Sequence, residues 1–337
     1  MSAAEEVVTE GHAVEAVPKR AMTLGTGTSL VVLAVLLLVP LVVKNFVIFQ
    51  MTMLLIYGLA VLALNILTGG SGQFSLGQSA FYAIGAYTSA ILMEQYNVNY
   101  ALTLPVAGII CFAAGFLFGQ PALRLSGVYL ALATFALATA MPQLLKLGYF
   151  EKWTGGVQGL VVTKPDAPFG LSMSQDMWLY YFTLLITIAI YLFSVNLLRS
   201  RSGRAFMAIR DNEIAASAMG VDVALYKTLA FGVSAGITGV AGGLGAIAVQ
   251  FVAPDSYTIT LAISLFLGMV VGGVGWLPGS FIGSAFIIFV PNIAESVSKG
   301  LSGAVFGVLL FLVIFLIPHG ARQVAILCQQ LAARLRR

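Results

Sequence analysis

Ten apolar runs separated by short polar segments make up most of the chain. Each run has about the 20 residues that a helix needs to cross a hydrocarbon core. Helices are expected rather than barrel strands, because the runs are long and lipid cannot satisfy unpaired backbone groups. The runs at 77–93 and 256–273 are short enough to be broken or re-entrant, so eight to ten helices are expected. The predicted spans are 22–43, 47–67, 77–93, 101–119, 128–145, 177–198, 228–250, 256–273, 277–294 and 303–318.

The composition fits a membrane protein with several spans. Hydrophobic residues make up 59% of the 337 residues and charged residues 9%, whereas a soluble chain carries about 25% charged residues. The 36 glycines fit close packing between helices in a membrane. The expected fold class is therefore an all-α polytopic membrane protein.

The placement of Lys and Arg predicts the orientation. Residues 199–227 hold four arginines and one lysine, and placing them inside puts both termini in the cytoplasm. Residues 1–21 are then expected to be a disordered cytoplasmic leader. Residues 319–337 are expected to be a basic amphipathic tail that lies on membrane lipid. The membrane domain is expected at 22–318, with its longest external loop at 146–176.

No predicted span contains Asp, Glu, Lys, Arg or His in its interior. Embedded charges mark ion pathways and proton relays, so a proton-coupled carrier is disfavoured. A sodium-coupled carrier can use carbonyls and hydroxyls at broken helices, so it is weakened but not excluded. The spans hold no cluster of catalytic or metal-binding residues, and the chain has no GxxxxGK[ST] loop for nucleotide. A transporter of this kind would need an energy source on another subunit.

The polar segment 199–227 is suited to contact such a subunit. Residues 204–219 are rich in helix formers and have no Gly or Pro before Gly220, which predicts one short helix ending there. Phe206, Ile209 and Met219 offer apolar contacts beside a polar face. A helix of this kind can dock in a groove of a soluble partner. The alternative is an ordinary surface helix that links two spans.

Glycine and serine interrupt the apolar pattern at 69–81 and 272–286. Both stretches run Gly-Gly-x-Gly and end in Ser-Ala-Phe. They predict an internal repeat of the kind found in transporters, or else two tight turns. Polar or small residues near the first stretch are candidates for the translocation path, or for hydrogen bonds that pack helices. These candidates are Gly70, Gly72, Gln73, Ser75, Gln78, Ser79 and Thr134.

Five segments between residues 54 and 318 resemble one known family. In chain order they are GGSGQFSLGQSAFYAIGAY, RLSGVYLALATFA, WTGGVQGL, GRAFMAIRDNEIAASAMGV with the following YKTLAF, and GGVGWLPGSFIGSAF. They are similar to the permeases of bacterial ATP-binding-cassette (ABC) importers for branched-chain amino acids, specifically the LivM-type subunit. The leader and the basic tail lie outside the resemblance.

The resemblance implies a pore subunit with an ABC importer permease bundle in the bacterial inner membrane. It implies a homologous LivH-type permease subunit, two ABC ATPase subunits and a periplasmic or extracellular solute-binding protein. ATP and Mg²⁺ would be bound by the ATPases, so this chain is expected to hold no cofactor, and no nucleic acid is expected to bind. The ATPase-coupling residues implied are Gly203, Arg204, Ala208, Arg210, Asp211, Asn212, Glu213, Ala215, Ala216 and Gly220.

The external loop is expected to contact the binding protein through Trp153, Thr154, Gly155 and Gly156. The alternative is an ordered loop that only caps helix ends. The resemblance implies leucine, isoleucine and valine as substrates, while urea, short amides or other amino acids stay open. Two other functions remain, an ion-coupled secondary transporter of small polar solutes and a membrane scaffold or receptor.

Overall fold

The computed structural model describes residues 34–40, 43–122, 127–166, 173–297 and 307, and these are largely helical. Strands β1 (Leu160–Val161) and β2 (Phe251–Val252) pair antiparallel and are a small departure from the predicted all-α fold. Residues 34–40 are helical as well. The other elements are α2 (Asn45–Asn65), the π-helical turn η2 (Ile66–Gly70), α3 (Gln78–Glu94), α4 (Tyr100–Ala122), α5 (Val128–Leu145), α6 (Glu151–Thr154), α7 (Gln175–Arg199), α8 (Arg201–Asp211), α9 (Glu213–Ala218), α10 (Val223–Val249), the 3-10 turn η4 (Pro254–Tyr257), α11 (Ile259–Gly272) and α12 (Gly279–Val297).

The predicted spans from 47–67 to 277–294 all coincide with helices. The spans at 22–43 and 303–318 lie mostly outside the described residues, and the leader and tail lie wholly outside them. In the described part of the chain, six helices are long and apolar enough to cross a membrane, which confirms a polytopic membrane protein. They are Asn45–Gly70, Tyr100–Pro121, Val128–Leu145, Gln175–Arg199, Val223–Val249 and Pro254–Gly272.

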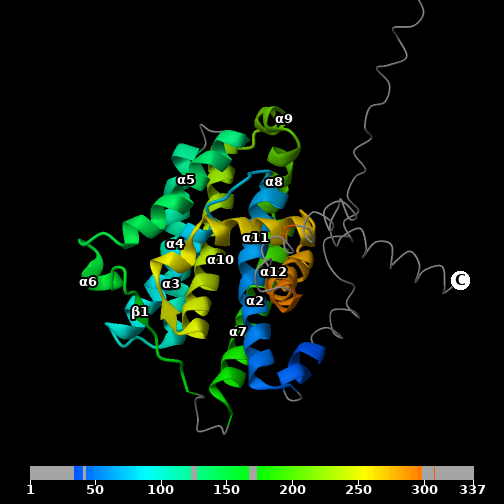
Figure 1. The fold of residues 1–337 in the computed structure, drawn as a ribbon. Coiled ribbons are helices and arrows are strands. Elements are labelled where there is room, and N and C mark those ends of the chain that lie inside the picture. The colour runs from blue at the N-terminus through cyan, green and yellow to red at the C-terminus, as the bar shows by residue number, and fades with distance from the viewer. Residues whose placement is uncertain (1–33, 41–42, 123–126, 167–172, 298–306, 308–337) are drawn as a thin grey trace, which may run out of the picture.

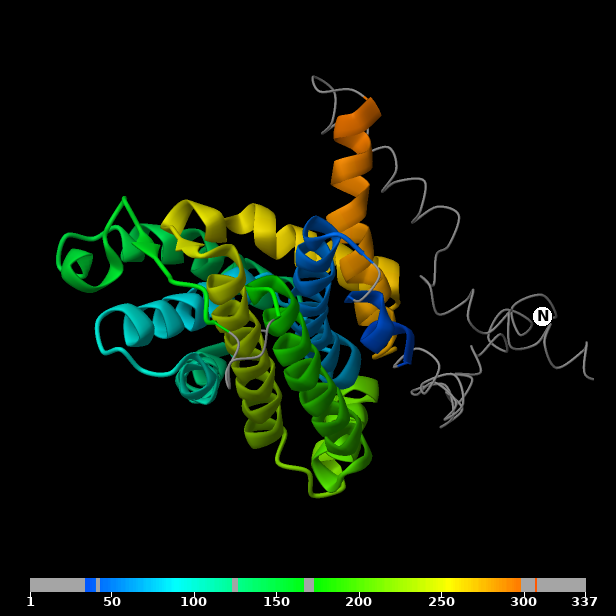
Figure 2. The ribbon, with the colours of Figure 1, turned by 90° about the horizontal axis from the view of Figure 1, so that it is seen from below.

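Helices α11 and α12 are joined by a short turn and both lie against α2. The two helices contact each other, and both contact α2. Figure 1 shows α11 running across α2 rather than along it, and Figure 2 shows α11 and α12 from below, running in different directions. The 14 residues of α11 alone span about 21 Å at 1.5 Å per residue, less than the roughly 30 Å hydrocarbon core, and only together with η4 does this segment reach the 19 residues of a candidate span. The short span predicted at 256–273 is therefore a 3-10 turn followed by a short crosswise helix.

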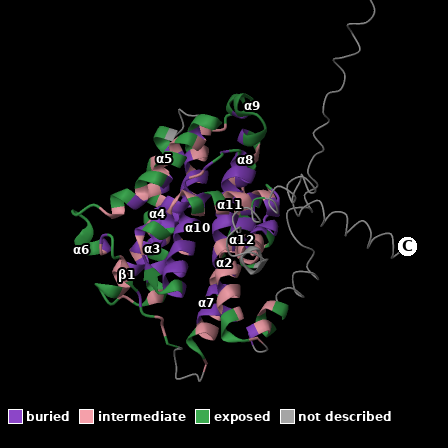
Figure 3. Cartoon of the chain, in the orientation of Figure 1, coloured by how far each residue is buried: buried purple, intermediate pink, exposed green. Residues whose placement is uncertain are grey.

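Helix α10 is the centre of the bundle. It contacts α2, α3 and α4, and Figure 3 shows it buried along most of its length. A Cβ atom added to Gly85 of α3 would lie 2.0 Å from the carbonyl oxygen of Gly239 in α10. The two helices thus touch backbone to backbone, which is the close packing that the glycine content predicts.

Replacing Gly85 with alanine is expected to lower the free energy of unfolding by about 1–3 kcal/mol, because the added methyl group forces α3 away from α10. Thermal unfolding of the purified protein in detergent measures the effect. Gly148→Ala is the matched control, since the nearest atom to its added Cβ is Glu151 Oε2 at 4.0 Å. Equal melting temperatures for both variants and the parent protein would contradict the prediction.

The connecting segments gather at two opposite ends of the bundle. At one end β1 pairs with β2, and Lys146 forms a 2.6 Å ion pair with Asp255. At the other end α8 and α9 lie beside the segment that joins η2 to α3, well away from α6 and β1 in Figure 1. This is the separation that the Lys and Arg pattern predicts between the external loops and the segment 199–227.

Candidate functional site

The π-helical turn η2 and the extended residues that follow it interrupt the chain between α2 and α3, and together they form the first break. Residues 72–77 are in neither a helix nor a strand, and three of them, Gln73, Ser75 and Gly77, are buried. Thr68 Oγ1 donates to the carbonyl oxygen of Gln73 at 3.0 Å, and Leu76 N donates to Thr134 Oγ1 at 2.9 Å. A membrane interior offers no water to unpaired backbone N–H and C=O groups. The side chains of Thr68 and Thr134 therefore satisfy backbone groups of the first break and fix its conformation.

Gln78 ties the start of α3 to the central helix. Its Nε2 donates to Ser234 Oγ at 2.8 Å, and its Oε1 accepts from Thr238 Oγ1 at 2.7 Å. Ser234 Oγ in turn donates to the carbonyl oxygen of Ala63 at 2.8 Å. This buried network joins α2, α3 and α10.

The residues predicted near the translocation path are mostly engaged inside the chain. Ser79 Oγ is buried with no hydrogen-bond partner in the described part of the chain. Gly70 and Gly72 lie at the end of η2 and just after it. Four others are buried and hydrogen-bonded within the subunit, namely Gln73, Ser75, Gln78 and Thr134. These bonds favour the helix-packing interpretation for these four residues, and a place on the path stays a prediction.

Asn65 of α2 holds the second break, which joins α11 to α12. Its Nδ2 donates to the carbonyl oxygens of Gly273 at 3.3 Å and Trp276 at 3.1 Å, and to Ser280 Oγ at 3.3 Å. Its Oδ1 accepts from Gly275 N at 2.7 Å. Asn65 is only 1% exposed. One buried amide therefore supplies partners to four polar groups of the break.

The two breaks touch each other. A Cβ atom added to Gly69 in the first break would lie 2.5 Å from the backbone nitrogen of Gly275 in the second. The sequence predicts a possible repeat from these two stretches, and the structure places them in direct contact. The internal repeat stays a hypothesis. Because the two breaks are in contact, a displacement of one would require the other to move as well.

The polar segment 199–227 folds as two helices, so the prediction of one helix over 204–219 is wrong. Asn212 lies between α8 and α9 with an extended backbone (φ −160°, ψ 109°). Its side chain accepts a hydrogen bond from Ala215 N at 3.0 Å, and asparagine is among the best residues for starting a helix in this way. The end of α9 follows the prediction, since Gly220 has a φ of +81°.

The apolar face of α8 packs on its own subunit. Phe206 and Ile209 are buried, and the Phe206 ring lies 6.2 Å from the ring of Tyr226. These two side chains were expected to be available to a partner, and their burial corrects that expectation. Two apolar side chains of α9 and the residue after it are exposed, Ile214 at 83% and Met219 at 85%.

Arg210 links α8 to the first break. Its Nη1 donates to the carbonyl oxygen of Gly69 at 2.8 Å. A Cβ atom added to Gly72 would lie 3.0 Å from Arg210 Cγ, so the arginine stem covers the backbone of the break. A hydrogen bond from a guanidinium is stronger than one between neutral groups. The polar segment 199–227 is thus bonded directly to the buried backbone of the first break.

Lys227 makes a second link between the same segments. Its carbonyl oxygen accepts from Gln73 Nε2 at 3.1 Å, and its Nζ forms a 2.6 Å ion pair with Glu213 at the start of α9. Among the other predicted coupling residues, Gly203 and Ala216 are buried inside the subunit. The exposed ones are Arg204, Ala208, Asp211, Asn212, Ala215 and Gly220.

The residues predicted to contact a binding protein surround α6 at the opposite end. Trp153 is 45% exposed, whereas Thr154 is buried and donates to the carbonyl oxygen of Leu145 at 3.0 Å. Gly155 and Gly156 follow with φ values of +70° and +57° and turn the chain toward β1. Trp153 is therefore accessible and Thr154 holds the loop in place, while the contact itself stays a prediction.

Sequence reasoning missed two polar features. The first is Asn65, the single amide side chain of the predicted span 47–67 apart from Gln50. A polar side chain within an apolar run indicates a buried hydrogen-bonding role, and this pattern could have identified it. The ion pair between Lys164 and Asp176 joins residues of the external loop that only the fold brings together. In the described part of the chain, no group of three or more His, Cys, Asp or Glu residues is placed to hold a metal ion.

A family model described as "branched-chain amino acid transport system / permease component" matches residues 46–317. The chain is 36% identical over 247 residues to the high-affinity branched-chain amino acid transport system permease protein LivM of Salmonella typhimurium. It is 26% identical over 234 residues to a probable LivM of Methanocaldococcus jannaschii, covering 65% of this chain and 67% of that protein. A probable LivH of the same organism is 24% identical over 246 residues, covering 69% and 74%. The comparison with solved structures found no match.

The match to the Salmonella protein covers 66% of this chain but only 58% of that relative's length. The family match is broader, since residues 46–317 run from the second residue of α2 past the end of α12. It therefore contains both breaks, Asn65 and the α8–α9 segment. The chain belongs to the branched-chain amino acid transport permease family, and it is similar to LivM-type subunits.

Proposed function

We propose that this chain is a membrane-spanning permease subunit of an ATP-driven ABC importer. Its cargo is a branched-chain amino acid or a related small amino acid, handed over by an external solute-binding protein. The family match and the names of the relatives support this proposal. The observation that carries the mechanism is the hydrogen bond from Arg210 to Gly69, because it links a segment that a soluble partner can reach to a buried break in the bundle.

The partners in this proposal bind at opposite ends of the bundle. Two ATPase subunits, which bind ATP and Mg²⁺, dock on α8 and α9, where Ile214 and Met219 expose large apolar side chains. Exposed apolar side chains on a short helix suit docking into a groove. The binding protein docks at the α6 end, where Trp153 is accessible. A homologous LivH-type subunit completes the pore.

The topology in this proposal has about ten helices, with both termini in the cytoplasm of a bacterium and the bundle in its inner membrane. The α8–α9 end then faces the cytoplasm, which agrees with the excess of Arg and Lys in residues 199–227. The Lys146–Asp255 pair and the β1–β2 ladder face outward.

Transport then proceeds by alternating access. Closure of the ATPases moves α8 and α9 as a lever, and Arg210 passes the displacement to the first break. The displacement then reaches α11 and α12 through the contact between Gly69 and Gly275 and through the hydrogen bonds of Asn65. Such rigid-body shifts between two packed arrangements are a common form of conformational switching.

Reconstitution of the chain in lipid vesicles tests the proposal. Leucine uptake is expected only when the second permease, both ATPases, ATP and loaded binding protein are present. An ion-coupled secondary transporter would instead take up solute with this chain alone under a sodium or proton gradient. Uptake by the isolated chain would overturn the proposal, and urea or short amides as competitors would reveal a different cargo.

A further inference from the structure

A partly buried ammonium group lies at the end of the bundle opposite α8 and α9. Lys164 follows β1, and its Nζ forms an ion pair with the carboxylate of Asp176. The same Nζ lies 6.0 Å from the centroid of the Phe49 ring. The side chain of Lys164 is 10% exposed and that of Asp176 is 29% exposed. A carboxylate and an aromatic ring thus flank one ammonium, which is a recurrent way of binding such cations.

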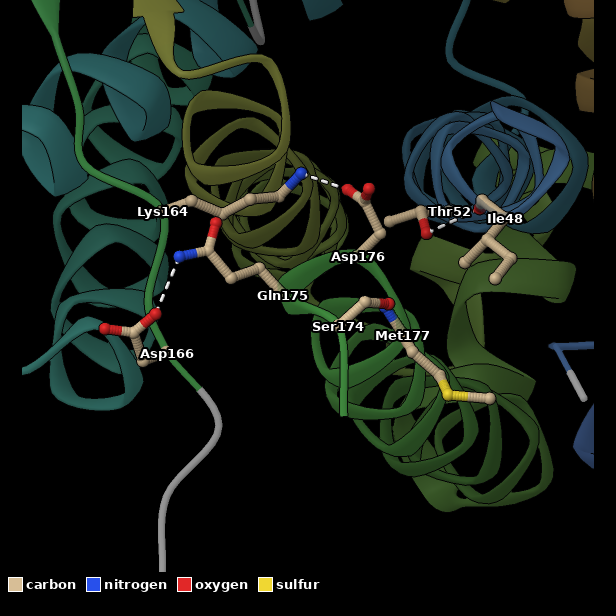
Figure 4. A network of polar contacts seen from close by, with 8 residues as sticks. All are labelled: Ile48, Thr52, Lys164, Asp166, Ser174, Gln175, Asp176 and Met177. Carbon is tan, nitrogen blue, oxygen red and sulfur yellow. Dashed lines mark hydrogen bonds and ion pairs between the residues drawn. The ribbon is translucent and has the colours of Figure 1, made fainter. Parts of the chain in front are cut away.

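The three groups come from three separate segments. Lys164 lies on the extended segment after β1, Asp176 in the first turn of α7 and Phe49 near the start of α2. Figure 4 shows Lys164 and Asp176 pointing toward one another, with α2 beside them. The site therefore lies where the first turns of α2 and α7 meet the extended segment that follows β1.

Anchoring of the extended segment does not require the Lys164 ammonium. Gln175 Nε2 already donates to Asp166 Oδ1 at 2.6 Å, which ties the same segment to the same end of α7. Ser174 Oγ already caps α7 by accepting from Met177 N at 3.3 Å. A partly buried ion pair contributes little net stability, because removing both charges from water offsets their attraction.

We propose that Lys164 is a built-in occupant of a binding site for the amino group of the transported amino acid. The substrate ammonium replaces the Lys164 ammonium between Asp176 and Phe49. The displaced Lys164 then pairs with the substrate carboxylate, so one ion pair becomes two and no charge is left unpaired. This inference rests on the proposed function, because it requires an amino acid as cargo.

The exchange recognises the amino and carboxylate groups of a zwitterion and does not discriminate between amino-acid side chains. A simple amine can satisfy Asp176 but leaves Lys164 without a partner, and a simple carboxylate can satisfy Lys164 but cannot replace it. An unpaired, partly buried charge is costly, so both ligands bind less well than an amino acid. The side chain of the substrate has no role in this recognition.

Direct binding to the assembled permease–ATPase complex, without the binding protein, tests the proposal. Saturation-transfer NMR suits weak ligands, and the probes are leucine, isoamylamine (leucine without its carboxylate) and isocaproate (leucine without its amino group). Asp176→Asn is expected to weaken leucine binding by about tenfold or more, since a charge-assisted bond is lost. Lys164→Met is expected to weaken leucine binding but to strengthen isoamylamine binding by about tenfold, because the competing occupant is gone.

The gain of amine binding separates this proposal from a purely structural role, which predicts losses only. Asp166→Asn is the matched control, since it removes a neighbouring negative charge, keeps an oxygen that can accept from Gln175, and leaves Lys164, Asp176 and Phe49 in place. Its leucine binding should stay within about twofold of the parent complex. The proposal is overturned if Lys164→Met does not gain amine binding, or if Asp176→Asn binds leucine as the parent does. If the parent complex takes up no amino acid with ATP, the proposed function fails instead.

Discussion

Replacing Arg210 with alanine is expected to lower ATP-driven leucine uptake by at least about tenfold while ATP hydrolysis continues. The variant loses the hydrogen bond from Arg210 to the carbonyl oxygen of Gly69. A bond from a charged donor contributes about 1.5–3 kcal/mol, which corresponds to a factor of about ten or more. Uptake and phosphate release are measured in the same vesicles with loaded binding protein.

The control for this prediction is Asp211→Asn. It removes the 2.8 Å ion pair between Arg210 and Asp211 but leaves the bond to Gly69. Because exposed ion pairs contribute about 0–1 kcal/mol, uptake should stay near that of the parent complex. A proportional fall of uptake and ATP hydrolysis in Arg210→Ala would contradict a coupling role. Arg210→Lys should be intermediate, because lysine keeps the charge but not the planar fork.

Replacing Asn65 with leucine is expected to lower the free energy of unfolding by roughly 4 kcal/mol. Leucine has the same branching at Cγ but is larger, so the change removes the hydrogen bonds, leaves no cavity and adds some overpacking. The four polar groups that Asn65 satisfies in the second break lose their partner. Each such buried group costs about 1–3 kcal/mol when it is left unsatisfied. Chemical unfolding in detergent, followed by circular dichroism, measures the loss.

Asn196→Leu provides the same chemical change at an exposed position of α7. Its effect should be within about 0.5 kcal/mol. The Asn65 variant should also expose the chain between α11 and α12 to limited proteolysis, because the clamp that fixes this turn is gone. If Asn65→Leu and Asn196→Leu unfold at the same denaturant concentration, Asn65 does not hold the break.

The positions of the helices could be predicted because they depend on local pattern. The apolar run at 128–145, for example, gives a helix with the same bounds. The end of α9 at Gly220 was predictable for the same reason, since a left-handed residue after a helix favours glycine. The interruption at Asn212 also has a local cause, because asparagine often starts a new helix. The strong helix formers on both sides of Asn212 nevertheless favoured the prediction of one continuous helix.

The polar links could not be predicted because they join residues far apart in the chain. The bond from Arg210 to Gly69 and the clamp of Asn65 on Gly275 depend on how the helices pack. The crosswise path of α11 has the same origin, since its apolar run also fits an upright span. Of the candidate site, the sequence therefore predicts which residues are polar but not which of them meet.

The buried Gln78 network constrains how the chain assembles during synthesis. Both partners of the Gln78 side chain, Ser234 and Thr238, lie on α10. About 100 residues separate the end of α4 from the start of α10, which a ribosome takes roughly 5–20 s to make at about 5–20 residues per second. During that interval the Gln78 amide and Gly85 of α3 lack their native partners on α10. The nascent chain therefore passes through a stage in which α3 depends on water, lipid headgroups or an insertion factor until α10 arrives.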